Sequence, residues 1–246
     1  MPNTYYVTYG NSILTAGAAG SAISVTSAVD PYNPYNLPAN TMRVKLAAGS
    51  DPTGQSWATQ TSLVDATENI WDITVSSFEW LGSSMVYSAC SPIEILGANT
   101  TGVTSLVGMC GNCTTLTSVA LFDTRSVTNM SSMFSHCNLT TLPLFPTGSV
   151  TDMHNMCLEC SALTAIPLFD TSSATNVGQA FLMCENVERG ALALYQQMST
   201  QATPPSNHTD AFGYCGSQTV TGAAELAQIP ASWGGTMSSE YSGTLG

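Results

Sequence analysis

Hydrophobic residues in the middle of the chain recur every 23 or 24 positions. Each repeat places apolar residues three and four positions apart ahead of a cysteine, as Met130, Met133 and Phe134 do ahead of Cys137. This spacing is typical of a helical or 3₁₀ segment, and the hydroxyl of Thr128 lies where it can cap the first turn. The cysteines that define the alignment are Cys90, Cys113, Cys137, Cys160 and Cys184.

After each cysteine the spacing changes to the strand pattern L-x-x-L-x-L. In one repeat the pattern comprises Leu139, Leu142 and Leu144, all three of which we expect to face the interior, followed by Phe145. A unit of about 20 to 29 residues with one strand and one helical segment is typical of leucine-rich repeats, whose coils bury their apolar side only by stacking. The equivalent positions are Leu116, Val119, Leu121 and Phe122 in the preceding repeat, and Leu163, Ile166, Leu168 and Phe169 in the next.

The flanks of the chain lack this period. Residues 1–80 alternate apolar and polar positions at 5–9, 23–25, 42–46 and 71–75, which predicts short half-buried strands. Past residue 190 the pattern favours helices, and a stack of coils needs a terminal cap. The sequence therefore predicts an α/β solenoid: a short leucine-rich-repeat stack of about five coils over 81–190, a β-rich N-terminal domain over 1–80 that caps or docks, and a helical C-terminal cap over 191–246.

Composition narrows the range of partners. Sixteen acidic against four basic residues give a formal charge of −12, and only 8% of the residues are charged, against about 25% in an ordinary domain. Nucleic-acid binding rests on Lys and Arg, so we expect no nucleic-acid partner. The sequence has no apolar run of about 18 or more residues, so we expect no membrane insertion. The first residues lack the basic end and apolar stretch of a secretory signal.

Two C-x-x-C pairs raise the possibility of zinc binding. They are Cys110 with Cys113 and Cys157 with Cys160, but Cys110 and Cys157 occupy the repeat position that holds phenylalanine in alternate coils. Such a position faces the interior, which favours buried thiols over a metal site. Parallel Cβ vectors in adjacent coils also disfavour disulfides. We therefore expect no metal and no cofactor, and a core ladder formed by Cys90, Cys113, Cys137, Cys160, Cys184, Phe122, Phe145 and Phe169.

Candidate chemistry is sparse. The three histidines, His136, His154 and His208, show no spacing that joins them to a nucleophile or to one another, so we expect no catalytic residues and no enzyme. The open strand face offers small polar side chains and no aromatic platform, which suits a flat protein contact; the alternative is a sheet face that is merely solvated. The candidate interaction residues are Thr117, Ser118, Ala120, Thr140, Thr141, Pro143, Thr164, Ala165 and Pro167.

The segments ALFDTRSVTNMSSMFSHC and IPLFDTSSATNVGQAFLMC resemble the BspA-like and Mycoplasma-lipoprotein-type leucine-rich repeats. The C-terminal stretch from Gly190 resembles the cap on repeat proteins of gut Bacteroidales and their bacteriophages, including crAss-like phages. The resemblance implies a non-enzymatic virion structural protein, in a fibre, decoration or tail-associated position, that contacts other virion proteins or a host surface. It also implies a homo-oligomer or part of a larger assembly. The alternative is an adhesin on the bacterial cell surface.

Overall fold

The computed structural model describes residues 6–9, 12–15, 24–25 and 30–235. The first three ranges are β1 (Tyr6–Tyr9), β2 (Ser12–Thr15) and β3 (Ser24–Val25), which pair as an antiparallel three-stranded sheet. Strands expected at 5–9 and 23–25 therefore correspond to β1 and β3, while Tyr5 and Ile23 lie outside the described residues.

A second sheet carries the chain into the repeats. Its strands are β4 (Thr41–Leu46), β5 (Ala58–Asp65), β6 (Ile70–Val75), β7 (Pro92–Asn99) and β8 (Ser118–Val119), in the order β5-β6-β4-β7-β8. All neighbours are antiparallel except β7 and β8, which are parallel. The sheet runs across the boundary expected at residue 80, because β7 and the preceding helix α1 (Leu81–Tyr87) join the N-terminal strands to the first coil.

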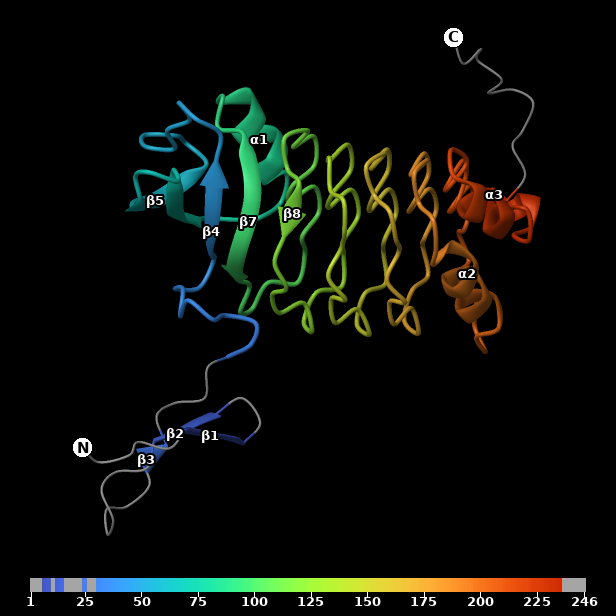
Figure 1. Ribbon diagram of the computed structural model, residues 1–246, viewed down its shortest axis with the longest axis horizontal. Helices are drawn as coiled ribbons and strands as arrows, with labels where there is room; N and C mark the ends of the chain where they lie inside the picture. The colour runs from blue at the N-terminus through green and yellow to red at the C-terminus, as the bar shows by residue number, and fades with distance from the viewer. Residues whose placement is uncertain (1–5, 10–11, 16–23, 26–29, 236–246) are drawn as a thin grey trace.

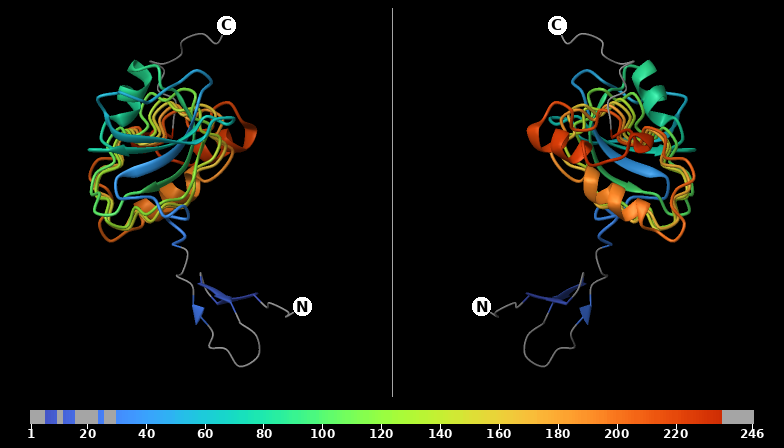
Figure 2. Two further views of the ribbon diagram at one scale, coloured as in Figure 1. Left: turned by 90° about the vertical axis from the view of Figure 1, so that its left-hand side faces the viewer. Right: turned by 90° about the vertical axis from the view of Figure 1, so that its right-hand side faces the viewer.

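Beyond β8 the chain forms coils that lie side by side (Figure 1). Parallel bridges link residues one repeat apart: Ser105 to Asn129, Asn129 to Asp152, Asp152 to Asn176, and Asn176 to Asn207. Viewed from either end, successive coils superimpose (Figure 2). The stack is therefore in register, and the assignment of its coils to the leucine-rich-repeat class stays a prediction.

The helix α1 precedes Cys90, as expected, but the segment ahead of each later cysteine of the period is a series of turns. The expectation of a helical or 3₁₀ segment is therefore wrong for those coils. Between residues 130 and 137, Ser132 and His136 adopt left-handed backbone, with φ of 54° and 58°. Their backbone N–H groups donate to the carbonyls of His154 and Leu158 in the next coil, at 2.9 and 2.7 Å. Alternate N–H groups thus leave the coil instead of closing helical turns, and hydrogen bonds between coils replace those of a helix.

The first turn is capped by the residue after the threonine. Asn129 Oδ1 accepts from the backbone N–H of Ser131 at 2.8 Å, and Asp152 Oδ1 accepts from that of His154 at 2.9 Å. The expected cap, Thr128, instead donates its hydroxyl to the carbonyl of Thr104 in the preceding coil. Thr151 repeats this bond to Thr128, so the threonines join the coils and the Asn or Asp side chains form the turns.

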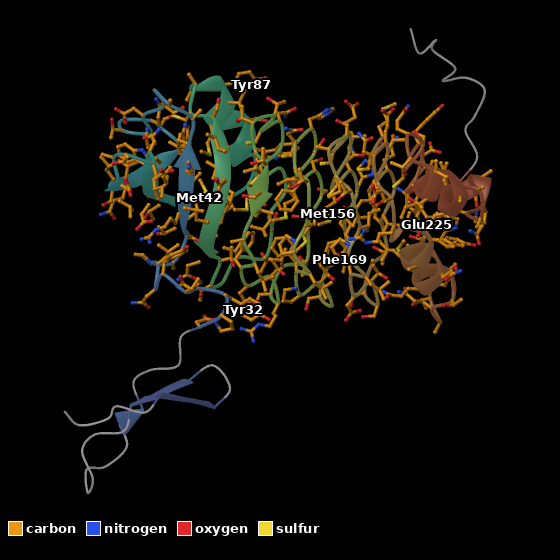
Figure 3. The ribbon with its side chains drawn as sticks, in the orientation of Figure 1. Tyr32, Met42, Tyr87, Met156, Phe169 and Glu225 are labelled. Carbon is orange, nitrogen blue, oxygen red and sulfur yellow. The ribbon has the colours of Figure 1, made fainter. Side chains whose placement is uncertain are left out.

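The interior of the stack is apolar. Phe122, Phe145 and Phe169 are fully buried, and the rings of Phe122 and Phe145 lie 5.0 Å apart between centroids. Phe134 stacks on Phe145 from the opposite wall at 6.1 Å. Figure 3 labels Met156 and Phe169, two of the side chains with no exposed surface. The core runs on without a break from β4 to the C-terminal helices.

The repeat continues past Cys184, the last cysteine in the 23- or 24-residue period. The N–H groups of Val177 and Phe181 donate to the carbonyls of Asn207 and Ala211, both at 2.8 to 2.9 Å. A further coil therefore follows, after the insertion that contains α2 (Ala191–Ser199). The helix α3 (Val220–Leu226) and the 3₁₀ turn η1 (Ala231–Trp233) close the stack. Across the described ranges, none of the helices has the length and apolar character needed to cross a membrane.

A pair of buried threonines provides a test of the bonds between coils. Thr124 Oγ1 donates to the Pro146 carbonyl at 2.6 Å, whereas the equivalent hydroxyl of Thr147 has no partner among the described residues. We expect Thr124→Val to lower the free energy of unfolding by about 1–2 kcal/mol, because it removes the hydrogen bond between the Thr124 hydroxyl and the Pro146 carbonyl. Thr147→Val is expected to be neutral or stabilising, because it removes an unpaired buried hydroxyl. Urea unfolding of both variants checks this, and equal losses would contradict it.

Candidate functional site

The expected interaction residues lie in three parallel rows along the strand side of the stack. The backbone N–H of Thr140 donates to the Thr117 carbonyl at 3.4 Å, and that of Thr164 donates to the Thr140 carbonyl at 3.1 Å. The side chains in the rows are half-buried or exposed. The rows are Thr117, Thr140 and Thr164; Ser118, Thr141 and Ala165; and Ala120, Pro143 and Pro167.

Prolines explain why this side holds little regular strand. The N–H of Ala120 donates to the Ile95 carbonyl at 2.8 Å, which continues the pairing of β7 with β8. Pro143 and Pro167 occupy the same place in the next two coils and have no N–H to donate. The ladder therefore thins after β8, and the coils are held together mainly through their turn segments and threonines.

A fourth row corrects the strand pattern. Leu121, Leu144 and Leu168, expected in the interior, expose 36%, 59% and 55% of their surface. The buried residue is in each case the phenylalanine that follows. Phe145 N–H bonds the Pro143 carbonyl at 2.9 Å, and this tight turn directs Leu144 outward and Phe145 inward. The strand face is thus graded, from threonine at one edge to proline and leucine at the other.

A shallow hollow of about 340 Å³ opens between two of these leucines. Leu144 and Leu168 line it together with Pro146, Gly148 and Asp170. Asp170 Oδ1 accepts from the backbone N–H of Ser172 at 3.0 Å, and the pKa of this carboxyl is lowered by its hydrogen bonds with Ser172. Asp170 is therefore ionised at neutral pH.

The equivalent aspartate two coils earlier has an internal partner. Asp123 accepts from Arg125 through both carboxylate oxygens, at 2.9 and 2.7 Å, and the pKa of Asp123 is lowered by this pair. The Arg125 guanidinium also lies 5.2 Å from the centre of the Tyr32 ring. Ser172 replaces arginine at this position in the coil of Asp170, and Asp170 forms no ion pair within the described ranges.

The sequence analysis did not predict that the segment containing Tyr32 and Tyr35 covers the strand side at Gly97, next to the leucine row. Tyr35 lies over Gly97, where a Cβ would stand 3.1 Å from the ring, and it also covers the guanidinium of Arg43 at 4.4 Å. Gly97 holds, one coil earlier, the position of Leu121. The contacts of Tyr35 with Arg43 and of Tyr32 with Arg125 hold this segment in place. The sequence shows all four residues, but nothing in it predicts that they are in contact.

All eight cysteines are buried and free. The thiols of Cys137, Cys160 and Cys184 each donate to a backbone carbonyl of the preceding coil at 3.0 Å. Burial raises the pKa of the Cys113 thiol to about 12 and that of Cys110 well above its usual value. In the part of the chain that the structure describes, no three His, Cys, Asp or Glu side chains gather in a way that could hold a metal ion.

The three histidines have separate neighbours. His136 Nδ1 lies 3.1 Å from Glu159 in the next coil, and His154 Nδ1 lies 2.8 Å from the Gly178 carbonyl. His208 stacks on Trp233 with 4.2 Å between ring centres. Each ring therefore links coils or closes the C-terminal end.

Comparison with known protein families gives one match, which includes most of the coils. Residues 83–194 match a family described as Mycoplasma protein of unknown function, DUF285. No curated protein matches the chain, and no solved structure matches it. The family match covers most of α1, the coils before α2 and the beginning of α2. It is consistent with the resemblance to Mycoplasma-type repeats and carries no bacteriophage or Bacteroidales context.

Proposed function

Starting from coils that match a Mycoplasma protein family, we propose that this protein is a non-enzymatic repeat protein that acts by contact, as a structural component of a bacteriophage particle. The observation that carries the proposal is the set of parallel rows on the strand side, where threonine recurs from coil to coil in one row and leucine in another. Such a surface offers the same chemistry at regular intervals and fits a flat or extended partner. The particle context rests on the resemblance of the C-terminal stretch.

The positions of the cysteine and leucine side chains support a function in binding rather than in catalysis. Three of the repeated thiols, those of Cys137, Cys160 and Cys184, donate to carbonyls of the preceding coil inside the stack. In contrast, Leu121, Leu144 and Leu168 are exposed, and the interior is filled by the phenylalanines that follow them. The chain thus places its chemistry in the stack and leaves its outer rows for recognition.

A bacterial cell-surface adhesin is the second candidate. It is favoured by the family match itself, because that family is described from a cellular organism. Both candidates use the same strand face, and they differ in where the protein resides.

Fractionation of an infected culture tests the proposal. We expect mass spectrometry to find the protein in gradient-purified particles, at a copy number that matches the symmetry of the capsid or tail. Uninfected cells of the same strain are the matched control. Absence from particles, with recovery in the outer-membrane fraction of uninfected cells, would overturn the particle assignment in favour of the adhesin.

A further inference from the structure

Leu121, Leu144 and Leu168 form a row that folding alone does not require. Other exposed apolar residues, such as Leu63 and Tyr87, stand on separate elements, whereas these three leucines recur at one repeat position in consecutive coils. The surrounding surface is rich in uncharged polar residues. Burying an exposed leucine against a partner removes apolar surface from water, which is favourable by about 25 cal/mol per Å². Binding of a partner would therefore stabilise the row in a way that contacts within this chain do not.

The hollow beside the row combines apolar walls with one negative charge. Leu144 and Leu168 line it, and the Asp170 carboxylate stands at its edge over Gly148, where a Cβ would come within 2.8 Å of Oδ2. An amphipathic side chain with an apolar stem and a cationic head fits this combination, because lysine and arginine bury their stems and keep their charge near a carboxylate.

The chain itself shows how such a site is filled. Arg125 occupies the equivalent place beside Asp123, bonding both carboxylate oxygens. The coil of Asp170 has no arginine of its own. The four cations of the sequence already face other carboxylates: Arg43 faces Asp72, Lys45 faces Glu68, Arg125 faces Asp123 and Arg189 faces Glu188.

We propose that Leu121, Leu144, Leu168 and Asp170 form a docking row for a segment of another protein that carries an arginine or lysine beside apolar side chains. A second copy of this chain fits this row poorly, because each copy has a formal charge of −12 and three of its four cations, Arg43, Lys45 and Arg125, are held close to carboxylates of the same chain. The inference deepens the proposed function and rests on it only in that the strand side acts by contact.

A library of random 12-residue peptides, displayed and selected on the full chain, tests the partner's chemistry. We expect the enriched peptides to carry arginine or lysine within a few residues of leucine, isoleucine, phenylalanine or methionine. Their affinity should fall about tenfold or more in the double variant Leu144→Ser with Leu168→Ser, and about fivefold in Asp170→Asn. Higher salt should weaken binding to the unaltered chain more than binding to Asp170→Asn.

Two control variants make the same chemical changes elsewhere. Leu63→Ser alters an exposed leucine on β5, and Glu79→Gln alters an exposed carboxylate; neither should change the affinity. Every variant changes an exposed residue, so thermal unfolding should confirm that each folds. Selection of no peptide, of acidic peptides, or of peptides that bind the double variant equally well overturns the inference. Such a failure leaves the result of particle fractionation untouched, so the two proposals fail separately.

Discussion

Phe145→Ala is expected to lower the free energy of unfolding by about 3–5 kcal/mol, the largest loss from a single truncation in the stack. Phe145 is 1% exposed and lies at the centre of an aromatic group, 5.0 Å from the ring of Phe122 and 6.1 Å from that of Phe134. The coils on both sides are joined to this one by backbone hydrogen bonds, so they cannot close over the cavity. The midpoint of urea unfolding, followed by circular dichroism, measures the loss.

The preceding residue is the matched control. Leu144 is 59% exposed, and Leu144→Ala should change the free energy of unfolding by no more than about 0.5 kcal/mol. A loss at Leu144 comparable with that at Phe145 would mean that the leucine row is buried in the folded protein. That outcome would contradict both the graded strand face and the docking row.

This pair also shows how far sequence reasoning reaches. The period was sufficient to align Cys113, Cys137, Cys160 and the phenylalanines, because a position that repeats apolar character from coil to coil contacts its own copies in a stack. It could not decide between Leu144 and Phe145 as the inward residue. Both are apolar, and the choice is made by a backbone turn at Pro143 that hydrophobic spacing does not record.

Other elements were hidden for different physical reasons. Strand β5 was missed because it lies at the edge of the sheet with most of its side chains exposed, so it has no alternation to detect. The coil after α2 was missed because its cysteine, Cys215, falls 31 residues after Cys184 and out of step with the period. A signal was present: Asn207, Ala211 and Phe212 repeat the order of Asn176, Ala180 and Phe181.

The turn segments were misjudged because their hydrogen bonds are not local. A spacing of three and four residues is shared by a helix and by this series of turns. The left-handed residues are mostly not glycine; they include Ser132, His136, Glu159 and Met183. Backbone of this kind is unfavourable for such residues in isolation. The left-handed conformation is stabilised here because the backbone N–H of each of these four residues donates to a carbonyl one coil away. Local sequence patterns do not reveal hydrogen bonds between residues so far apart in the chain.

The eight cysteines are expected to be inert toward thiol reagents until the protein unfolds. The thiolate is the reacting species. With a pKa of about 12 for Cys113, on the order of one in ten thousand Cys113 side chains is ionised at pH 8. Cys137, Cys160 and Cys184 are further held by bonds to carbonyls. Titration with a chromogenic disulfide at pH 8 should detect less than one thiol in the native protein and eight in about 6 M guanidinium.

An added thiol at the surface controls for reagent access. Leu168 is 55% exposed, so Leu168→Cys should contribute one thiol that reacts within minutes in the folded state while the other eight stay protected. Because the eight native thiols are buried, increasing the pH from 8 to 9 should speed the reaction of the added thiol but leave that of the native eight limited by unfolding. Fewer than eight thiols in the denatured unaltered chain, or fewer than nine in denatured Leu168→Cys, would reveal disulfides. Zinc released on denaturation would reveal a metal site. Either result would contradict a stack whose eight cysteines are buried free thiols.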